Sequence, residues 1–205
     1  MEEIKDKYKT IARKSQGLYK EKGSKFLSFA FPINNETEIK AIQLQLRKEY
    51  YDARHHVFAW RIGVNEDNYR ASDDGEPANS SGPPVLGQIR SYELSDILIV
   101  VIRYFGGTKL GIPGLINAYK TAAKDAIENN SIIEKIITNT YRLSFAYEDM
   151  NIVMRKLKEE NIEQFNQKFD LNCSLEIKIR LSNCEKVEQI FNKLPQVKIE
   201  KYNNQ

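Results

Sequence analysis

A glycine-rich segment with two cations shows the pattern most typical of anion-binding chemistry in this chain. Residues 102–115 read IRYFGGTKLGIPGL and include Arg103 and Lys109. The segment also holds four of the ten glycines, namely Gly106, Gly107, Gly111 and Gly114. It joins an apolar run to an amphipathic run, so we expect it to lead from a buried strand into a helix N-terminus. Unpaired N–H groups and the helix dipole favour anions there. These residues are therefore candidates for phosphate contact, with charge-assisted bonds from the two cations.

A structural explanation of the same glycines stays open. Glycine also serves where the backbone needs a positive φ or where two backbones approach closely. The segment is not a Walker A loop, because no Gly-Lys-Ser/Thr follows, and it does not match GxGxxG. The sequence thus permits both a phosphate cradle and a tight turn.

An acidic segment, SDDGEP at residues 72–77, offers Asp73, Asp74 and Glu76. Neighbouring carboxylates could hold Mg²⁺ or share a proton. The ligand spacing of an EF-hand is absent, and Asp-Gly favours turns in which the Asp side chain bonds nearby N–H groups. We expect a capped turn, in which Asp73 or Asp74 pairs with Arg54 or Arg103.

His55 and His56 are the two histidines of the chain. As neighbours on an expected strand they point to opposite faces, so they cannot jointly hold one metal ion. His56 shares its face with Phe58 and Trp60, and we expect it to be partly buried and hydrogen-bonded. His55 and Arg54 are the better candidates for the anion-binding surface. No nucleophile is visibly paired with either histidine, so we assign no catalytic residue, metal ligand or cofactor.

The elements expected around these residues make an α+β chain. Residues 17–33 indicate two strands about a turn, and 96–105 indicate a central strand covered on both faces. Residues 64–84 form a polar segment that we expect to be a loop. The remaining expected elements of this part are helices at 35–50, 84–94 and 113–130 and a strand at 53–62.

A change of composition near residue 138 predicts a second domain, so we divide the chain into 1–137 and 138–205. The order β-α-β-β-α-β there is typical of a ferredoxin-like domain. Tyr141, Phe145 and Tyr147 share a face with an intervening leucine, and we expect them in the core. The polar row of the strand at 171–181 has no aromatic residue, so we expect no base stacking on this sheet.

Composition favours a chain without membrane spans or disulfides. The 205 residues carry a net charge of +3, with 41% hydrophobic and 29% charged residues. The polar N-terminus predicts no signal peptide, and no apolar run is long enough to cross a membrane. Cys173 and Cys184 have no metal-type spacing, so we expect reduced thiols and a cytoplasmic location. Residues 7–25 contain seven basic residues against one acid, which suits either polyanion binding or a solvated face.

Three motifs in this order resemble the IMPACT/YigZ family. They are ARHHVFAW at 53–60, SDDGEPANSSGPPVLGQI at 72–89 and VVIRYFGGTKLGIPGLINAY at 100–119. The resemblance implies an N-terminal α/β sandwich like domain IV of elongation factor G, followed by a ferredoxin-like domain. It also implies a link to translation, because eukaryotic relatives regulate translation initiation. Two departures from the pattern are Val57, where many members have cysteine, and Pro113; Val57 argues against thiol chemistry at that strand.

We therefore expect a non-enzymatic regulator of translation that associates with RNA or the ribosome. Its binding face would combine the glycine segment, its two cations, Arg54, His55 and the basic N-terminal hairpin. One alternative is a metal-assisted enzyme acting on a nucleotide or phosphorylated metabolite, with the acidic segment as ligand set. Another is an adaptor for a protein partner that uses the polar segment at 63–84.

Overall fold

The chain folds into two units of mixed α and β structure, and the computed structural model describes residues 6–64 and 67–202. The first unit comprises residues 8–135. The second comprises residues 136–202 together with the described residues that precede Tyr8. The sequence analysis set the boundary two residues later and did not assign the N-terminal residues to the second unit. Each unit has a hydrophobic core of its own.

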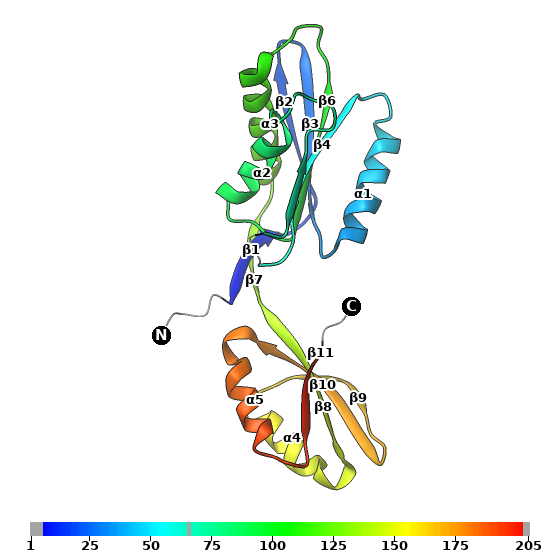
Figure 1. Cartoon of the computed structure of the whole chain (residues 1–205), viewed down its shortest axis with the longest axis vertical. Helices are drawn as coiled ribbons and strands as arrows, with labels where there is room; N and C mark the ends of the chain where they lie inside the picture. Colours follow the sequence, from blue (N-terminus) through cyan, green and yellow to red (C-terminus); the bar gives the residue numbers. More distant parts are fainter. Residues whose placement is uncertain (1–5, 65–66, 203–205) are drawn as a thin grey trace. The chain divides into compact units, whose positions relative to one another are not determined.

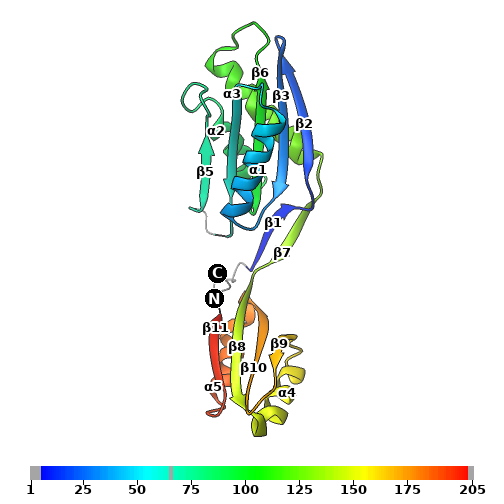
Figure 2. The same cartoon turned by 90° about the vertical axis from the view of Figure 1, so that its right-hand side faces the viewer.

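Five antiparallel strands form the main sheet of the first unit, in the order β2-β3-β6-β4-β5 (Figure 2). They are β2 (Ser15–Glu21), β3 (Ser24–Pro32), β4 (His55–Arg61), β5 (Tyr69–Ser72) and β6 (Ile97–Tyr104). Helices α2 and α3 cover one face of the sheet and α1 covers the other (Figure 1). Their bounds are α1 (Glu36–Glu49), α2 (Gly82–Ser91) and α3 (Gly111–Glu128).

Strand β6 lies at the centre of this sheet, as its continuous apolar sequence predicts. Its residues alternate between two cores: Ile99 and Val101 face α2 and α3, while Val100 and Ile102 face α1. Strand β4 shows the same alternation, with Val57 on the α2–α3 side and Trp60 on the α1 side. Period-two alternation thus sorts each strand between two helix layers.

Helices α1 and α3 differ in how their N-termini are capped. The side chain of Asn35 accepts a hydrogen bond from the N–H of Glu38 at 3.0 Å, which makes it the N-cap of α1. Helix α3 begins differently, because its N-cap residue, Leu110, has no side-chain hydrogen bond and its first turn contains no acid. The positive end of the α3 dipole is therefore not compensated by the helix itself.

Three strands were not predicted. Strand β5 lies inside the polar segment at 64–84, where the sequence predicted a loop; residues 65 and 66 of that segment lie outside the described residues. Its polarity follows from its position at the sheet edge, where β4 is its one partner. Strands β1 (Lys7–Ile11) and β7 (Ile132–Ile136) form a two-stranded sheet, and the division between the units falls within both.

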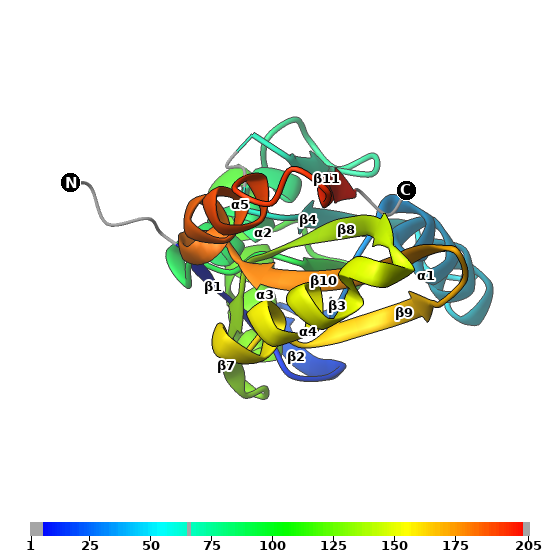
Figure 3. The same ribbon diagram turned by 90° about the horizontal axis from the view of Figure 1, so that it is seen from below.

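The second unit contains a four-stranded antiparallel sheet in the order β11-β8-β10-β9 (Figure 3). The order β-α-β-β-α-β along the chain is the one that the sequence predicts. The elements are β8 (Thr138–Ala146), α4 (Met150–Glu159), β9 (Gln164–Lys168), β10 (Asn172–Arg180), α5 (Cys184–Asn192) and β11 (Lys198–Tyr202).

The core of this unit lies between one sheet face and the two helices, and it includes Tyr141 and Phe145 as expected. Tyr147 is a correction to the sequence analysis. Strand β8 ends at Ala146 and Tyr147 begins a 3₁₀ turn, so the alternation stops and the ring is 62% exposed. Cys173 and Cys184 are buried free thiols. Among the described residues, no helix is both long and apolar enough to cross a membrane.

Candidate functional site

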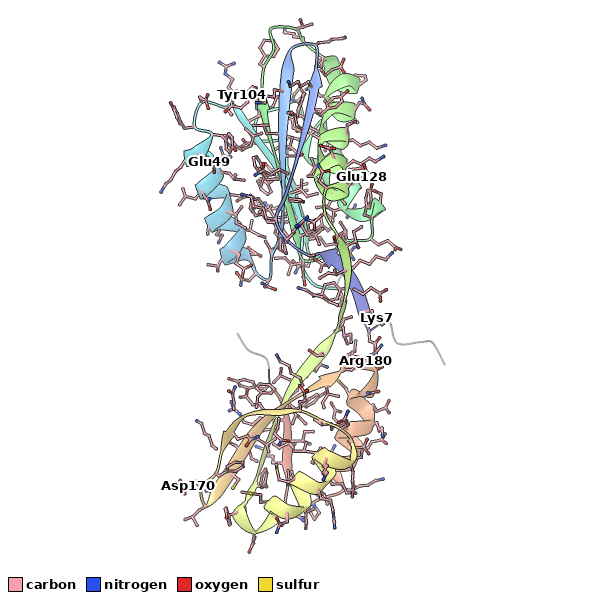
Figure 4. All side chains as sticks on the ribbon, turned by 180° about the vertical axis from the view of Figure 1, so that it is seen from behind. Lys7, Glu49, Tyr104, Glu128, Asp170 and Arg180 are labelled. Carbon is pink, nitrogen blue, oxygen red and sulfur yellow. The ribbon has the colours of Figure 1, made fainter. Side chains whose placement is uncertain are left out.

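One end of the first sheet brings together the motifs that the sequence analysis singled out. In the strand register Arg103 is paired with Phe26 on one side and with His55 on the other. The β2–β3 turn, the start of β4 and the glycine segment after β6 therefore lie at the same end. Strand β5 runs antiparallel to β4, so the acidic segment that follows Ser72 reaches this end too. Tyr104, labelled in Figure 4, marks it.

The glycine segment is fixed by a backbone contact with the β2–β3 hairpin. Lys22 and Gly23 both have positive φ, 46° and 78°, which is typical of a two-residue hairpin turn. This turn lies directly against Gly106, where an added Cβ would stand 1.8 Å from the carbonyl carbon of Gly23. The N–H of Gly106 donates to the hydroxyl of Ser24 at 3.1 Å. Close packing, one of the two explanations left open, thus accounts for this glycine.

The rest of the glycine segment lies at the surface. Gly107 and Gly111 have φ values of 87° and 69°, so both use a conformation that other residues rarely adopt. Gly107, Thr108, Lys109 and Gly111 are exposed, and the uncapped start of α3 follows directly. A solvated stretch of backbone amides therefore does lead into the N-terminus of a helix.

Arg103 does not join this exposed surface. Its side chain is 7% exposed and its Nη1 donates to Oε1 of Glu76 at 2.6 Å. The same oxygen accepts a hydrogen bond from the hydroxyl of Tyr119 at 2.8 Å. The Tyr119 ring packs edge-on against Phe26 at 5.1 Å. We therefore remove Arg103 from the candidate anion-binding residues, because its guanidinium is engaged inside the unit.

Burial of Tyr119 raises the pKa of its hydroxyl far above the usual range, and the charge of Glu76 adds to this effect. Tyr119 is therefore protonated at neutral pH and donates to Glu76. Arg103, Glu76 and Tyr119 form a set of bonded side chains, which we call the Glu76 cluster; within it the buried Nε of Arg103 has no hydrogen-bond partner among the described residues. It joins the acidic segment to β6 and α3.

The other two acidic residues also have internal partners. The carboxylate of Asp74 accepts a hydrogen bond from the backbone N–H of His56 at 2.6 Å. It also forms an ion pair with Arg47 of α1 at 2.6 Å. Its carbonyl accepts a hydrogen bond from Nδ1 of His55 at 2.9 Å. This corrects the expected pairing with Arg54 or Arg103.

Asp73 caps helix α2. Its Oδ1 accepts hydrogen bonds from the N–H groups of Ser81 and Gly82 at 2.9 and 2.8 Å and from the Ser81 hydroxyl at 2.7 Å. Burial raises the pKa of Asp73, but these bonds outweigh that effect and hold the pKa below its usual value. The capped turn that the sequence favoured is thus present. Within the described residues, no group of three or more His, Cys, Asp or Glu side chains is arranged to hold a metal ion.

His56 is buried on the α1 side and is only 5% exposed. Neither ring nitrogen makes a hydrogen bond of normal geometry, contrary to the expected hydrogen-bonded histidine. Burial lowers the pKa of His56, and the nearby positive charge of Arg47 lowers it further. The ring is therefore held neutral at pH 7, with its backbone tied to Asp74.

Exposed lysines surround this end of the sheet. Lys20 and Lys25 are directly opposite each other on β2 and β3, although like charges in that position destabilise a hairpin. They are exposed, as are Lys22, Lys109 and Arg54. In the part of the chain that the structure describes, none of the five forms an ion pair. The sequence analysis combined the basic hairpin and the glycine segment in one binding face. It did not note that Lys20 and Lys25 are cross-strand neighbours, although the symmetric spacing about the Lys22-Gly23 turn indicates this.

A profile of the Impact N-terminal domain matches residues 22–127, which is half of the chain and contains every residue of this site except Lys20. The chain belongs to the IMPACT family. This confirms the resemblance drawn from the three motifs. The match covers strands β3 to β6 and the three helices, apart from the last residue of α3; strand β2 precedes the match, which ends before the second unit.

Curated relatives of this IMPACT family member come from bacteria and eukaryotes. The protein YvyE of Bacillus subtilis is 31% identical over 136 residues, which span 66% of this chain and 63% of YvyE. An IMPACT family member of Haemophilus influenzae is 29% identical over 169 residues, which span 80% of this chain and 82% of the relative. The chain thus matches a little under two thirds of the length of YvyE.

A solved structure described as a hypothetical protein supports the fold of the whole chain. It covers 98% of this IMPACT family member with a TM-score of 0.73 and 24% identity, and all of that chain is matched. At this level of identity the likeness concerns the fold alone.

The contact between Gly106 and the hairpin gives a first prediction. Gly106→Ala forces a Cβ into the Gly23 backbone, which cannot move aside as a side chain can, so we expect a loss of about 3 kcal/mol in unfolding free energy. Gly87→Ala is the matched control, since its added Cβ meets nothing within 4 Å inside α2 and is expected to be neutral or slightly stabilising. Urea unfolding of both variants measures the difference. Equal stabilities would contradict the close packing.

The Glu76 cluster gives a second prediction. Glu76→Gln keeps the shape of the side chain but leaves the buried guanidinium of Arg103 without a counter-charge, so we expect a loss of about 3–5 kcal/mol. Tyr119→Phe removes one hydrogen bond from the same oxygen and should cost only about 1 kcal/mol. Urea unfolding at pH 7, monitored by tryptophan fluorescence, compares the stabilities of the two variants. Similar small losses would show that the ion pair is not needed.

His56 gives a third prediction, on pH. Because folding lowers its pKa below the ordinary 6.5, the folded state binds fewer protons than the unfolded state under mildly acidic conditions. Its contribution to stability is therefore complete above pH 6.5 and is lost as the pH falls below that value. In His56→Gln the slope of unfolding free energy against pH between 6.5 and 5 should decrease, by at most about 1.4 kcal/mol per pH unit. Identical slopes in parent and variant would refute this role.

Proposed function

We propose that this protein is a non-enzymatic regulator of translation that associates with RNA or the ribosome in the cytoplasm. The first unit would contact phosphate through the exposed part of the glycine segment and the surrounding cations. The residues that we retain from the sequence analysis are Gly107, Lys109, Gly111, Gly114, Arg54 and His55, together with the exposed lysines of the basic hairpin, Lys20, Lys22 and Lys25. Gly106 shapes the segment, and Arg103 supports it from inside.

The observation that carries this proposal is the unbalanced charge at one end of the first sheet. Lys20 and Lys25 face each other across the hairpin without an acid between them, and Lys109 lies on the glycine segment that packs on the same hairpin. A protein gains nothing in stability from such an arrangement. A polyanion would relieve the repulsion, and the release of its counterions would favour binding.

The three acids of the acidic segment do not cancel this charge, and Glu21 of the hairpin accepts a hydrogen bond from the Tyr19 hydroxyl at 2.8 Å. Glu76 is neutralised by Arg103, Asp74 by Arg47, and Asp73 by the N–H groups at the start of α2. The three carboxylates therefore present little negative potential to an approaching phosphate. The same pairing removes support from the metal-assisted enzyme, which needed these carboxylates as ligands, and we do not carry that alternative forward.

Two finer statements about architecture belong to this proposal. We propose that the first unit is related to domain IV of elongation factor G and that the second is ferredoxin-like. The three-layer arrangement of the first unit and the β-α-β-β-α-β order of the second support them. The link to translation itself rests on membership of the IMPACT family, with YvyE and eukaryotic proteins named IMPACT among the relatives.

Removal of the hairpin and loop cations tests the proposal. In the double variant Lys25→Ala/Lys109→Ala we expect weaker binding to RNA. The slope of log affinity against log salt should flatten by about 1 for each phosphate contact removed. Fluorescence anisotropy with a labelled RNA hairpin between 50 and 200 mM KCl would measure both, and co-sedimentation with ribosomes would test that partner.

Lys40→Ala serves as the control for net charge. Lys40 is exposed and lies near the start of α1, which follows the opposite end of β3. Its removal should leave affinity and salt slope within error of the parent protein. If the parent binds neither RNA nor ribosomes at 50 mM KCl, the proposal is wrong.

A further inference from the structure

The second unit has a sheet face that is not covered by its helices. The core residues of β8 and β10 point toward α4 and α5, and the alternate residues of both strands point to the other side. In the described part of the second unit, no helix packs on this other side. Asp170, in the β9–β10 turn, and Arg180, at the far end of β10, mark its two ends in Figure 4. We call it the open face.

The open face carries aromatic rings that the sequence analysis did not place there. It assigned the aromatic residues of β8 to the core and found none in the polar row of β10, and therefore expected no base stacking. The strand register changes this result, because Phe165 of β9 is paired with Glu176 of β10, and Tyr202 of β11 with Thr140 of β8. Paired residues share a face, so both edge strands bring an aromatic ring to the open face. Both rings are half-buried.

Each of these rings lies beside a cation from the neighbouring strands. Nζ of Lys178 is 5.4 Å from the centre of the Phe165 ring, and the guanidinium of Arg142 is 4.2 Å from the centre of the Tyr202 ring. Aromatic rings and guanidinium planes are the groups on which proteins stack unpaired bases. The pairing also holds the rings in place, which reduces the entropy lost on binding.

The charge of the open face favours a polyanion. Its acids have partners: Glu176 is 5% exposed and accepts hydrogen bonds from Arg142 and Asn166, both at 2.8 Å, while Glu200 pairs with Lys198 at 2.7 Å. The hydrogen bond from Arg142, followed by that from Asn166, lowers the pKa of Glu176. Two exposed cations of the face, Lys168 and Lys178, form no ion pair with any described residue.

We propose that the open face binds single-stranded RNA, with unpaired bases stacked on Phe165 and Tyr202 and backbone phosphates near Lys168 and Lys178. The two rings stand on opposite edge strands, three inter-strand steps of about 4.8 Å apart, so they are roughly 15 Å from each other. They therefore receive two separate bases, and the ligand is an oligonucleotide rather than a single nucleotide. This site goes beyond the proposed function, because it lies in the other unit and does not depend on the glycine segment.

The test measures anisotropy of a fluorescein-labelled 12-mer of uridine with the full chain. Phe165→Leu and Tyr202→Leu keep an apolar side chain but remove the ring, and each should weaken binding roughly 5- to 100-fold without changing the salt slope. Lys178→Ala should instead flatten the slope by about 0.7. Phe169→Leu is the matched control: this ring is 50% exposed in the β9–β10 turn, outside the paired strands, and its loss should have no effect. Uridine monophosphate should not compete.

Several outcomes would overturn this inference while leaving the proposed function intact. One is that both ring variants bind the 12-mer as the parent does, while Lys25→Ala/Lys109→Ala loses binding. Another is that an RNA duplex or heparin competes as well as the 12-mer, which would indicate charge alone. Thermal unfolding checks that the variants are folded. Should a ring variant not fold, photocrosslinking of a 4-thiouridine 12-mer to the parent protein decides the question, since peptides containing Phe165 or Tyr202 must carry the crosslink.

Discussion

The buried ion pair between Arg103 and Glu76 is the interaction on which the candidate site depends. It joins the end of the central strand to a polar segment that would otherwise have little reason to fold onto the sheet. Desolvation makes such a pair costly unless its remaining polar groups are satisfied, and Tyr119 supplies one further hydrogen bond from α3. With Glu76 fixed, Asp74 can reach the start of β4 and Asp73 the start of α2. The three neighbouring acids thus contact five elements: Glu76 contacts β6 and α3, Asp74 contacts β4 and α1, and Asp73 contacts α2.

This use of acids determines the electrostatics of the surface. Because the three carboxylates of the acidic segment are engaged with arginines and backbone N–H groups, they form no ion pair with the lysines of the hairpin or the glycine segment. The net charge of the chain is only +3, so its overall charge does not indicate a polyanion-binding protein. The separation of charges at one end of the first sheet does indicate such a protein. The local distribution of charges is therefore more informative here than the net charge of the chain.

Much of this arrangement could be predicted from the sequence, and the failures have physical reasons. Alternation along β4 assigned His56 and Trp60 to the same face, and the core on the α1 side confirms this for Trp60, because alternation is a local signal. The partner of Arg103 was not predictable, since Glu76 and Arg103 meet only through the antiparallel register of β4, β5 and β6. The aromatic residues of the open face were missed for the same reason: the sequence of a single strand does not show which residues the neighbouring strands contribute to its face. Edge strand β5 was missed because its polar sequence is like that of a loop.

The division of the chain has a consequence for its biosynthesis. Asp6 belongs to the second unit, where it bonds Arg180, a residue 174 positions later in the chain. Residues 8–135 have all their sheet partners within reach once the ribosome has released them, so the first unit can fold while the rest is still being made. Strand β1 therefore spans the division. Residues 8–11 belong to the first unit, whose synthesis finishes earlier, and Lys7 belongs to the second unit, whose synthesis finishes later. Asp6, which is made before the first unit, must therefore wait for Arg180, which is made after it, before its contacts are complete.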